Sequence, residues 1–88
     1  MSSEAWSLEF ERRAVKDLER LDPPIRDRVV AALQQLIADP VAAQLVKLTG
    51  RPEHRLRVGD WRVILELEHA THTVVVLRVL PRGRVYER

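Results

Sequence analysis

The 88-residue sequence contains no cysteine, which excludes a disulfide framework and a thiolate zinc site. No apolar run approaches the ~20 residues of a membrane-spanning helix, and no N-terminal stretch resembles a signal peptide. The sequence also lacks a glycine-rich phosphate loop and a serine or cysteine nucleophile paired with a base. We therefore expect a cytoplasmic protein with no membrane segment.

Lysine is scarce, since Lys16 and Lys47 are the only two among 15 basic residues. Residues 51–88 hold eight basic side chains, all of them arginine, and five acidic ones, whereas residues 1–50 hold seven basic and eight acidic. Arginine is suited to two-pronged contact with phosphate and to stacking on bases. A coding bias toward arginine gives the same composition, so the positions of the arginines have to decide between these interpretations.

The chain length predicts a single domain covering residues 1–88, and the apolar patterns predict the α+β class. Alternation at residues 6–10 predicts a short strand, and helical spacing follows at residues 11–21. Asp22 and Pro23 mark the start of a second helix, which is expected to end before Pro40. The short link between the helices predicts a two-helix hairpin. Residues 40–53 are expected to form a connection.

From residue 54 the apolar pattern changes to a period of two, which predicts strands at residues 54–58, 61–68 and 73–80. Residues 59–60, Gly-Asp, have the composition of a two-residue hairpin turn, and "EHATHT" forms a looser connection. Such strands form an antiparallel three-stranded meander. We expect the helix hairpin to pack on one face of this sheet.

Three arginines share the other face of this predicted sheet. A loop at residues 59–60 places Arg57 opposite Arg62, with Arg55 on the same face because side chains alternate along a strand. Like charges directly opposite each other destabilise a sheet. Two interpretations remain open: a solvated face partly neutralised by Glu66, or an anion-binding site.

The segment "RVLPRGRVYER" adds further arginines and the only tyrosine of the chain. Arg78 is predicted to lie on the same face, and the extension of its strand leads to Arg82, Arg84 and Tyr86. Guanidinium groups beside an aromatic ring suit RNA, whose phosphates pair with arginine and whose unstacked bases lie on rings. The alternative for Tyr86 is packing on the sheet edge. His69 and His72 lack supporting ligands, so no metal site is expected there.

The sequence resembles the RelE/ParE superfamily of bacterial and archaeal toxins from type II toxin–antitoxin systems. The segments "KLTGRPEHRLRVGDWRVILEL" and "VLRVLPRGRVY" carry this resemblance, and the expected order of elements matches the superfamily over nearly the whole chain. The resemblance is to the RelE-like branch, which cuts messenger RNA in the ribosomal A site. It implies a RelE-like fold and a ribosome-dependent endoribonuclease. The alternative is a ParE-like inhibitor of DNA gyrase, which binds protein and cuts nothing.

The resemblance also implies site residues. The functional positions of RelE-like toxins match Arg55 with Arg57, Arg62, Arg82 and Tyr86, of which we expect Arg55, Arg62, Arg82 and Tyr86 to be catalytic. Arg57, Arg78 and Arg84 are expected to bind RNA, the last two because of their places on the basic face and in the C-terminal segment. Some relatives have a lysine two positions before Arg55, where this chain has Glu53, which we consider a possible base.

The implied reaction is attack of a ribose 2′-hydroxyl on the neighbouring phosphate, with neither a metal nor another cofactor. The implied partners are a cognate antitoxin, the ribosome and messenger RNA, or DNA gyrase in the alternative. Two further interpretations are a degenerate toxin that only binds its partners and a small α+β domain with a basic face.

Overall fold

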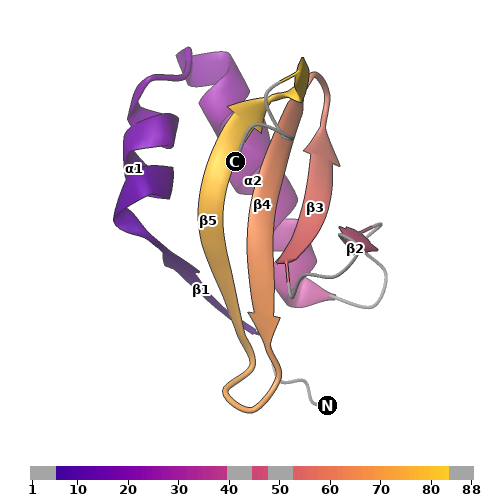
Figure 1. Cartoon of the computed structure of the whole chain (residues 1–88). Coiled ribbons are helices and arrows are strands. Elements are labelled where there is room, and N and C mark those ends of the chain that lie inside the picture. Colours follow the sequence, from indigo (N-terminus) through magenta and orange to yellow (C-terminus); the bar gives the residue numbers. More distant parts are fainter. Residues whose placement is uncertain (1–5, 40–44, 48–52, 84–88) are drawn as a thin grey trace.

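The structure is a computed structural model that describes residues 6–39, 45–47 and 53–83 (Figure 1). In chain order its elements are β1 (Ser7–Phe10), α1 (Arg12–Glu19), α2 (Pro23–Ala38), β2 (Leu45–Lys47), β3 (Glu53–Val58), β4 (Trp61–Glu68) and β5 (Thr73–Pro81). The predicted α+β order of one strand, two helices and a three-stranded meander is confirmed. Asp22 is the N-cap of α2, and Pro23 is its first helical residue, as the sequence predicts.

The strands form one five-stranded sheet in the order β1-β5-β4-β3-β2. The meander β3-β4-β5 is antiparallel throughout. At one edge β1 pairs parallel with residues 73–76 of β5, so the sheet is mixed rather than purely antiparallel. The sequence predicts the strand at β1 but not its partner, because pairing depends on where the two helices return the chain.

The expectation that residues 40–53 form only a connection is wrong at β2. This strand pairs antiparallel with residues 54–56 of β3 and forms the other edge of the sheet. A strand of three residues is too short to give a periodic apolar pattern. β2 forms because the backbone N–H and C=O groups on the outer edge of β3 are available for pairing, and the apolar pattern of the sequence does not reveal this.

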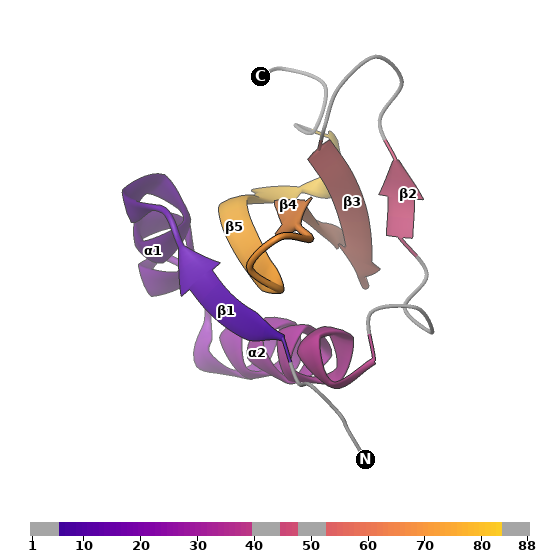
Figure 2. The ribbon, with the colours of Figure 1, turned by 90° about the horizontal axis from the view of Figure 1, so that it is seen from below.

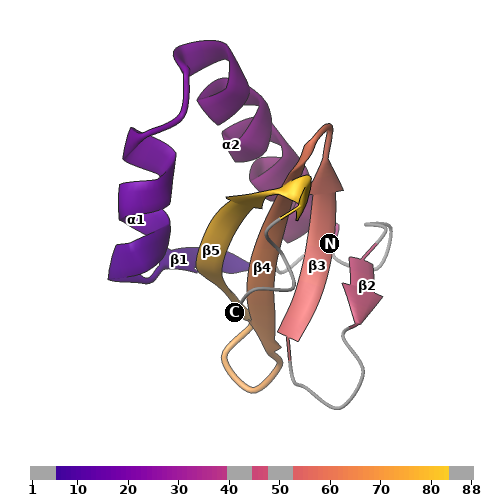
Figure 3. The same ribbon diagram turned by 45° about the horizontal axis from the view of Figure 1, so that its top comes forward.

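The helices are joined by three residues and then diverge, as Figures 1 and 3 show. α2 crosses one face of the sheet, and α1 flanks the β5 edge (Figure 2). The side chains that meet in the core include Ala14 and Leu21 of the α1 region, Val29, Leu33 and Leu36 of α2, and Leu56, Val63, Leu65, Val74, Val76 and Val79 of the sheet. This confirms the predicted helix-covered face. Among the described residues, no helix lies on the opposite face, which we call the open face.

Asp17 of α1 continues the edge of β5 where its pairing with β1 ends. Its Oδ2 accepts a hydrogen bond of 2.9 Å from the Val79 amide, so a carboxylate takes the place of a neighbouring strand. Arg78 donates to both carboxylate oxygens, from Nε to Oδ2 at 2.8 Å and from Nη2 to Oδ1 at 3.2 Å. Asp17 follows Ala14 by three positions and precedes Leu21 by four, so it lies on the buried stripe of the helix. A charged residue on that stripe is the feature of the sequence that indicates this contact.

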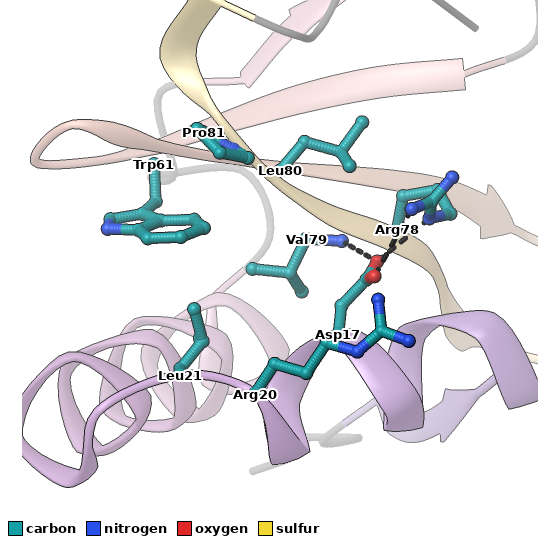
Figure 4. A pocket seen from close by; sticks show the side chains of 8 residues that line it. All are labelled: Asp17, Arg20, Leu21, Trp61, Arg78, Val79, Leu80 and Pro81. Carbon is teal, nitrogen blue, oxygen red and sulfur yellow. Dashed lines mark hydrogen bonds and ion pairs between the residues drawn. The ribbon is translucent and has the colours of Figure 1, made fainter.

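A cleft of about 170 Å³ lies beside this ion pair, and Figure 4 shows the side chains that line it. Its lining comprises Asp17, Arg20, Leu21, Trp61, Arg78, Val79, Leu80 and Pro81. Burial alone would raise the pKa of Asp17, but hydrogen bonds from Arg78 and the Val79 amide, together with the charges of Arg78 and Arg20, hold the pKa below its usual value. The ionised carboxylate therefore joins α1 to β5.

At the far end of the sheet, the β4–β5 connection packs on the start of β1. The His72 ring stacks on Trp6 with centroids 5.1 Å apart, and the His69 ring meets Trp6 edge-on at 5.3 Å. The Ser7 amide donates to the His72 carbonyl at 2.8 Å. In this part of the chain the histidines thus contribute packing. None of the helices within the described ranges combines the length and apolar character needed to cross a membrane.

Replacing Asp17 by Asn is expected to lower the free energy of unfolding by about 2–3 kcal/mol at pH 7, because Arg78 loses its counter-charge. The pKa of Asp17 is lower in the folded than in the unfolded chain. Its contribution is therefore fully present above the unfolded pKa of about 3.9 and is lost as the pH falls through the folded pKa.

Urea unfolding at neutral and acid pH measures both effects. The difference between wild type and Asp17→Asn should shrink in acid. The control is Asp27→Asn, an exposed carboxylate on α2, which should change stability by less than about 0.5 kcal/mol. Equal behaviour of the two variants would contradict the role assigned to Asp17.

Candidate functional site

The site is built around the turn between β3 and β4. Val58 pairs with Trp61, which leaves Gly59 and Asp60 as the two turn residues, as the sequence predicts. Gly59 has a φ of 58°, in the left-handed region where a residue without Cβ has no steric cost. The predicted register is confirmed, with Arg57 opposite Arg62 and Arg55 opposite Ile64.

Arg82 reaches the same end of the sheet from β5. Its amide donates to the Asp60 carbonyl at 2.8 Å, one residue beyond the pairing of Trp61 with Pro81. The guanidinium groups of Arg57, Arg82 and Arg55 each lie close enough to Arg62 to lower its pKa. We call Arg55, Arg57, Arg62 and Arg82 the arginine cluster. It gathers side chains from β3, from β4 and from the residue that follows β5 at one end of the open face.

Arg62 is the anchored member of the cluster, and its residue exposure is only 9%. Its Nη1 donates to the carbonyls of Gly59 and Trp61, both at 2.9 Å, so the guanidinium folds back onto the turn. Burial lowers the pKa of Arg62, and the positive charges of Arg57, Arg82 and Arg55 lower it further, while Asp60 acts in the opposite direction. The surroundings of Arg62 therefore disfavour its positive charge.

Arg57 and Arg82 are the open members of the cluster. Both are exposed, and neither guanidinium makes a hydrogen bond or ion pair with any residue in the described ranges. Arg55 is half-buried. The cluster therefore combines one fixed guanidinium with two that present unused donors to solvent.

Two apolar side chains form a floor beneath the arginines. Ile64 is fully buried and Leu80 is 5% exposed, although both lie on the open face. Leu80 pairs with Arg62, and Ile64 lies between Arg55 and Arg78 in the strand register. An apolar floor excludes water from beneath the guanidinium groups. It therefore strengthens their interaction with an anion.

The acidic residues of the open face lie farther from the turn. Glu53 pairs with Glu66 across β3 and β4, and both are half-buried. Glu53 precedes Arg55 by two positions on the same face, and strand geometry separates it from Arg57 by about 13 Å along β3. The open face is thus basic at the turn and acidic toward its other end.

The structure places the remaining predicted residues as follows. Arg78, a predicted RNA contact, is held by Asp17 on α1, and its side chain is 19% exposed. We therefore leave Arg78 out of the arginine cluster. Arg84 and Tyr86 lie outside the described residues. Asp17, which fixes Arg78 and the end of β5, was not among the predicted site residues.

Substituting Arg57 by Gln is expected to raise the free energy of unfolding by about 0.5 kcal/mol at low salt, because it removes a like charge directly opposite Arg62. The gain should disappear near 1 M salt, where the Debye length falls to about 3 Å.

Urea unfolding of wild type and variant at both salt concentrations measures this effect. Arg13→Gln is the control, since Arg13 is exposed on α1 away from the cluster. A salt-independent loss of stability in Arg57→Gln would contradict repulsion within the cluster.

Comparisons with known proteins agree with this geometry. The archaeal RelE–RelB complex from Pyrococcus horikoshii has a chain 26% identical to this one, with a TM-score of 0.78 over 93% of this chain and 100% of that one. The toxin–antitoxin complex RelBE2 from Mycobacterium tuberculosis gives 27% identity and a TM-score of 0.76, covering 90% and 100%. The isolated RelE toxin of E. coli gives 25% and 0.73, covering 94% and 90%. No curated protein sequence matches the chain.

A family model described as the ParE toxin of the type II toxin–antitoxin system parDE matches residues 8–86, which covers both helices, the meander and the arginine cluster. The fold is RelE-like, as the structural neighbours show. The chain belongs to the ParE toxin family, and so to the RelE/ParE superfamily of toxins from type II toxin–antitoxin systems.

Proposed function

We propose that this toxin is a ribosome-dependent endoribonuclease of the RelE type, which cleaves messenger RNA in the A site. The observation that carries the proposal is the arginine cluster, in which the strand register and the turn bring four arginines near one another beside the buried side chains of Ile64 and Leu80. Repulsion among these arginines lowers the stability of the fold. A bound phosphate would offset this repulsion, because its negative charge attracts each guanidinium group.

The proposed reaction needs no metal. The ribose 2′-oxygen attacks the adjacent phosphorus and forms the 2′-O–P bond as the P–O5′ bond breaks, which leaves a 2′,3′-cyclic phosphate. A base takes the 2′-hydroxyl proton, and an acid supplies a proton to the leaving 5′-oxygen. Negative charge grows on the phosphorane oxygens, so cations fixed in advance lower the barrier.

In this proposal Arg62 and Arg82 stabilise the phosphorane, with Arg55 beside them and Arg57 holding the RNA backbone. Arg62 suits the first role because its hydrogen bonds to the turn fix its position before substrate arrives. Arginine is a poor base, because its guanidinium group stays protonated at neutral pH.

We therefore assign proton transfer to other groups. Tyr86 is the proposed acid or stacking group, and Glu53 is a possible base. Arg84 is proposed as a further RNA contact.

The proposed partners are a cognate antitoxin, the ribosome and its message. Two related toxins have been crystallised in toxin–antitoxin complexes. An antitoxin segment with acidic side chains would complement the basic end of the open face. Such a segment would cover the arginine cluster or displace it from its productive geometry.

The second candidate is inhibition of DNA gyrase by protein binding. The matching family model is described as a ParE toxin, and Glu53 stands where some RelE-like relatives have lysine. On this alternative the arginine cluster contacts protein, and no RNA is cut.

The test adds purified toxin to translating ribosomes and maps the 5′ ends of the reporter message. We expect cuts within A-site codons, and a rate about 10²-fold lower for Arg62→Ala and for Arg82→Ala. Arg82 is exposed, so its variant separates loss of catalysis from loss of folding. Arg13→Ala should cut at the wild-type rate. An intact message together with inhibited gyrase supercoiling would establish the alternative instead.

A further inference from the structure

Arg28 approaches the β3–β4 turn from the helix side. It lies in α2 (Pro23–Ala38), and its guanidinium rests against the bare backbone of Gly59. A Cβ atom at residue 59 would lie only 3.0 Å from Arg28 Nη2 and 3.7 Å from its Cζ. The absence of a side chain at Gly59 therefore creates the space that this guanidinium occupies.

The charge of Arg28 is not used within the described part of the fold. The side chain is exposed and makes no hydrogen bond or ion pair with a described residue. The helix positions three and four residues away hold proline, isoleucine and two alanines, so no carboxylate of α2 lies at a pairing position. Asp27 is adjacent in sequence, but successive residues of a helix do not face each other. By contrast, Arg26 has Asp22 four positions earlier.

The turn is thus flanked by guanidinium groups on both sides. Arg62 is bonded to the Gly59 carbonyl from the sheet side, and Arg28 lies against the same residue from the helix side. Arg57 and Arg82 are close by on the open face. The basic surface therefore continues around the end of the sheet instead of stopping at the arginine cluster.

We propose that Arg28 is an additional phosphate-binding residue, which holds a second phosphate of a single-stranded RNA where the strand passes around the Gly59 turn. The inference rests on the proposed nuclease function and adds to it a residue outside the arginine cluster. The fork-shaped, permanently charged guanidinium suits a phosphate group, and its exposure leaves its donors accessible. We assign Gly59 a positioning role, because a Cβ atom at this position would lie 3.0 Å from Arg28 Nη2 and the guanidinium would have to shift.

The test measures binding of a 2′-O-methyl RNA oligonucleotide, which has no free 2′-hydroxyl for cleavage, by fluorescence anisotropy across a range of salt concentrations. Arg28→Ala should weaken binding about fivefold, as expected for one exposed ion pair. It should also reduce the slope of log Kd against log salt by about 0.7, the value for one phosphate contact on a single strand. Arg13→Ala, the control on α1, should change neither quantity.

Gly59→Ala provides a second variant with Arg28 still present. Because alanine at a φ of 58° also strains the turn that holds Arg62, the readout is the further effect of Arg28→Ala in the Gly59→Ala background. That further loss should be small, since the added Cβ has already displaced the Arg28 guanidinium. Additive losses would show that the two residues act separately and would overturn the positioning role of Gly59. Circular dichroism confirms that each variant is folded.

The outcomes separate this inference from the proposed function. An unchanged slope in Arg28→Ala, with a reduced slope in Arg57→Ala, would overturn the role of Arg28 and leave the nuclease proposal intact. Failure of the wild-type toxin to bind the RNA and to cut messages on ribosomes would overturn both. If Arg28→Ala left RNA binding unchanged but weakened gyrase inhibition, Arg28 would belong to a protein interface, and the inference would be wrong.

Discussion

The pairing of Arg57 with Arg62 across the Gly59–Asp60 turn is the constraint on which the arginine-rich end of this protein depends. The register of β3 and β4 places the two positive charges opposite each other, and the amide of Arg82 brings a third charge to the same turn. Shifting the register by one residue would relieve this repulsion but would also move Leu56 and Val63 out of the core. The hydrophobic core thus enforces an arrangement that the charges alone would avoid.

The toxin holds this arrangement in place with backbone acceptors and an apolar floor. Within the described structure no carboxylate forms an ion pair with Arg62. Its guanidinium instead donates to two carbonyls of the turn. Ile64 and Leu80 keep water out beneath it. By contrast, Arg78 has a full counter-charge in Asp17 and stabilises the junction of α1 with β5. Arg62 and Arg78 thus share one face of the sheet but differ in their partners, which are backbone carbonyls of the turn for Arg62 and the Asp17 carboxylate for Arg78.

Much of the fold was predictable because its signals are local. The period of two in β3, β4 and β5, the Gly-Asp turn and the Asp22-Pro23 helix start identified the meander and α2. The turn also fixed the pairing of Arg57 with Arg62, since a two-residue loop leaves one register. The strand β2 and the parallel pairing of β1 were not predictable, because three residues carry no period and pairing across the chain depends on tertiary packing.

The site was predictable only in part, for a related physical reason. Alternation along a strand showed which arginines share a face. It could not show that Arg78 has a carboxylate partner and Arg62 has none among the described residues, since the partner of Arg78 is 61 residues away on α1. The approach of Arg28 to Gly59 depends likewise on where α2 crosses the sheet. Contacts between elements distant in sequence leave no periodic trace, although Asp17 on the buried stripe of α1 was a visible anomaly.

The central claim is that the arginine cluster is retained because it binds a phosphate-bearing ligand. Thermal unfolding with increasing inorganic tripolyphosphate, at constant ionic strength, tests this directly, because a ligand that binds only the folded state raises the midpoint by mass action. The account predicts a rise for the wild-type toxin and little or none when Arg57 and Arg82 are both replaced by glutamine. An equal rise in both proteins, or none in the wild type, would contradict it.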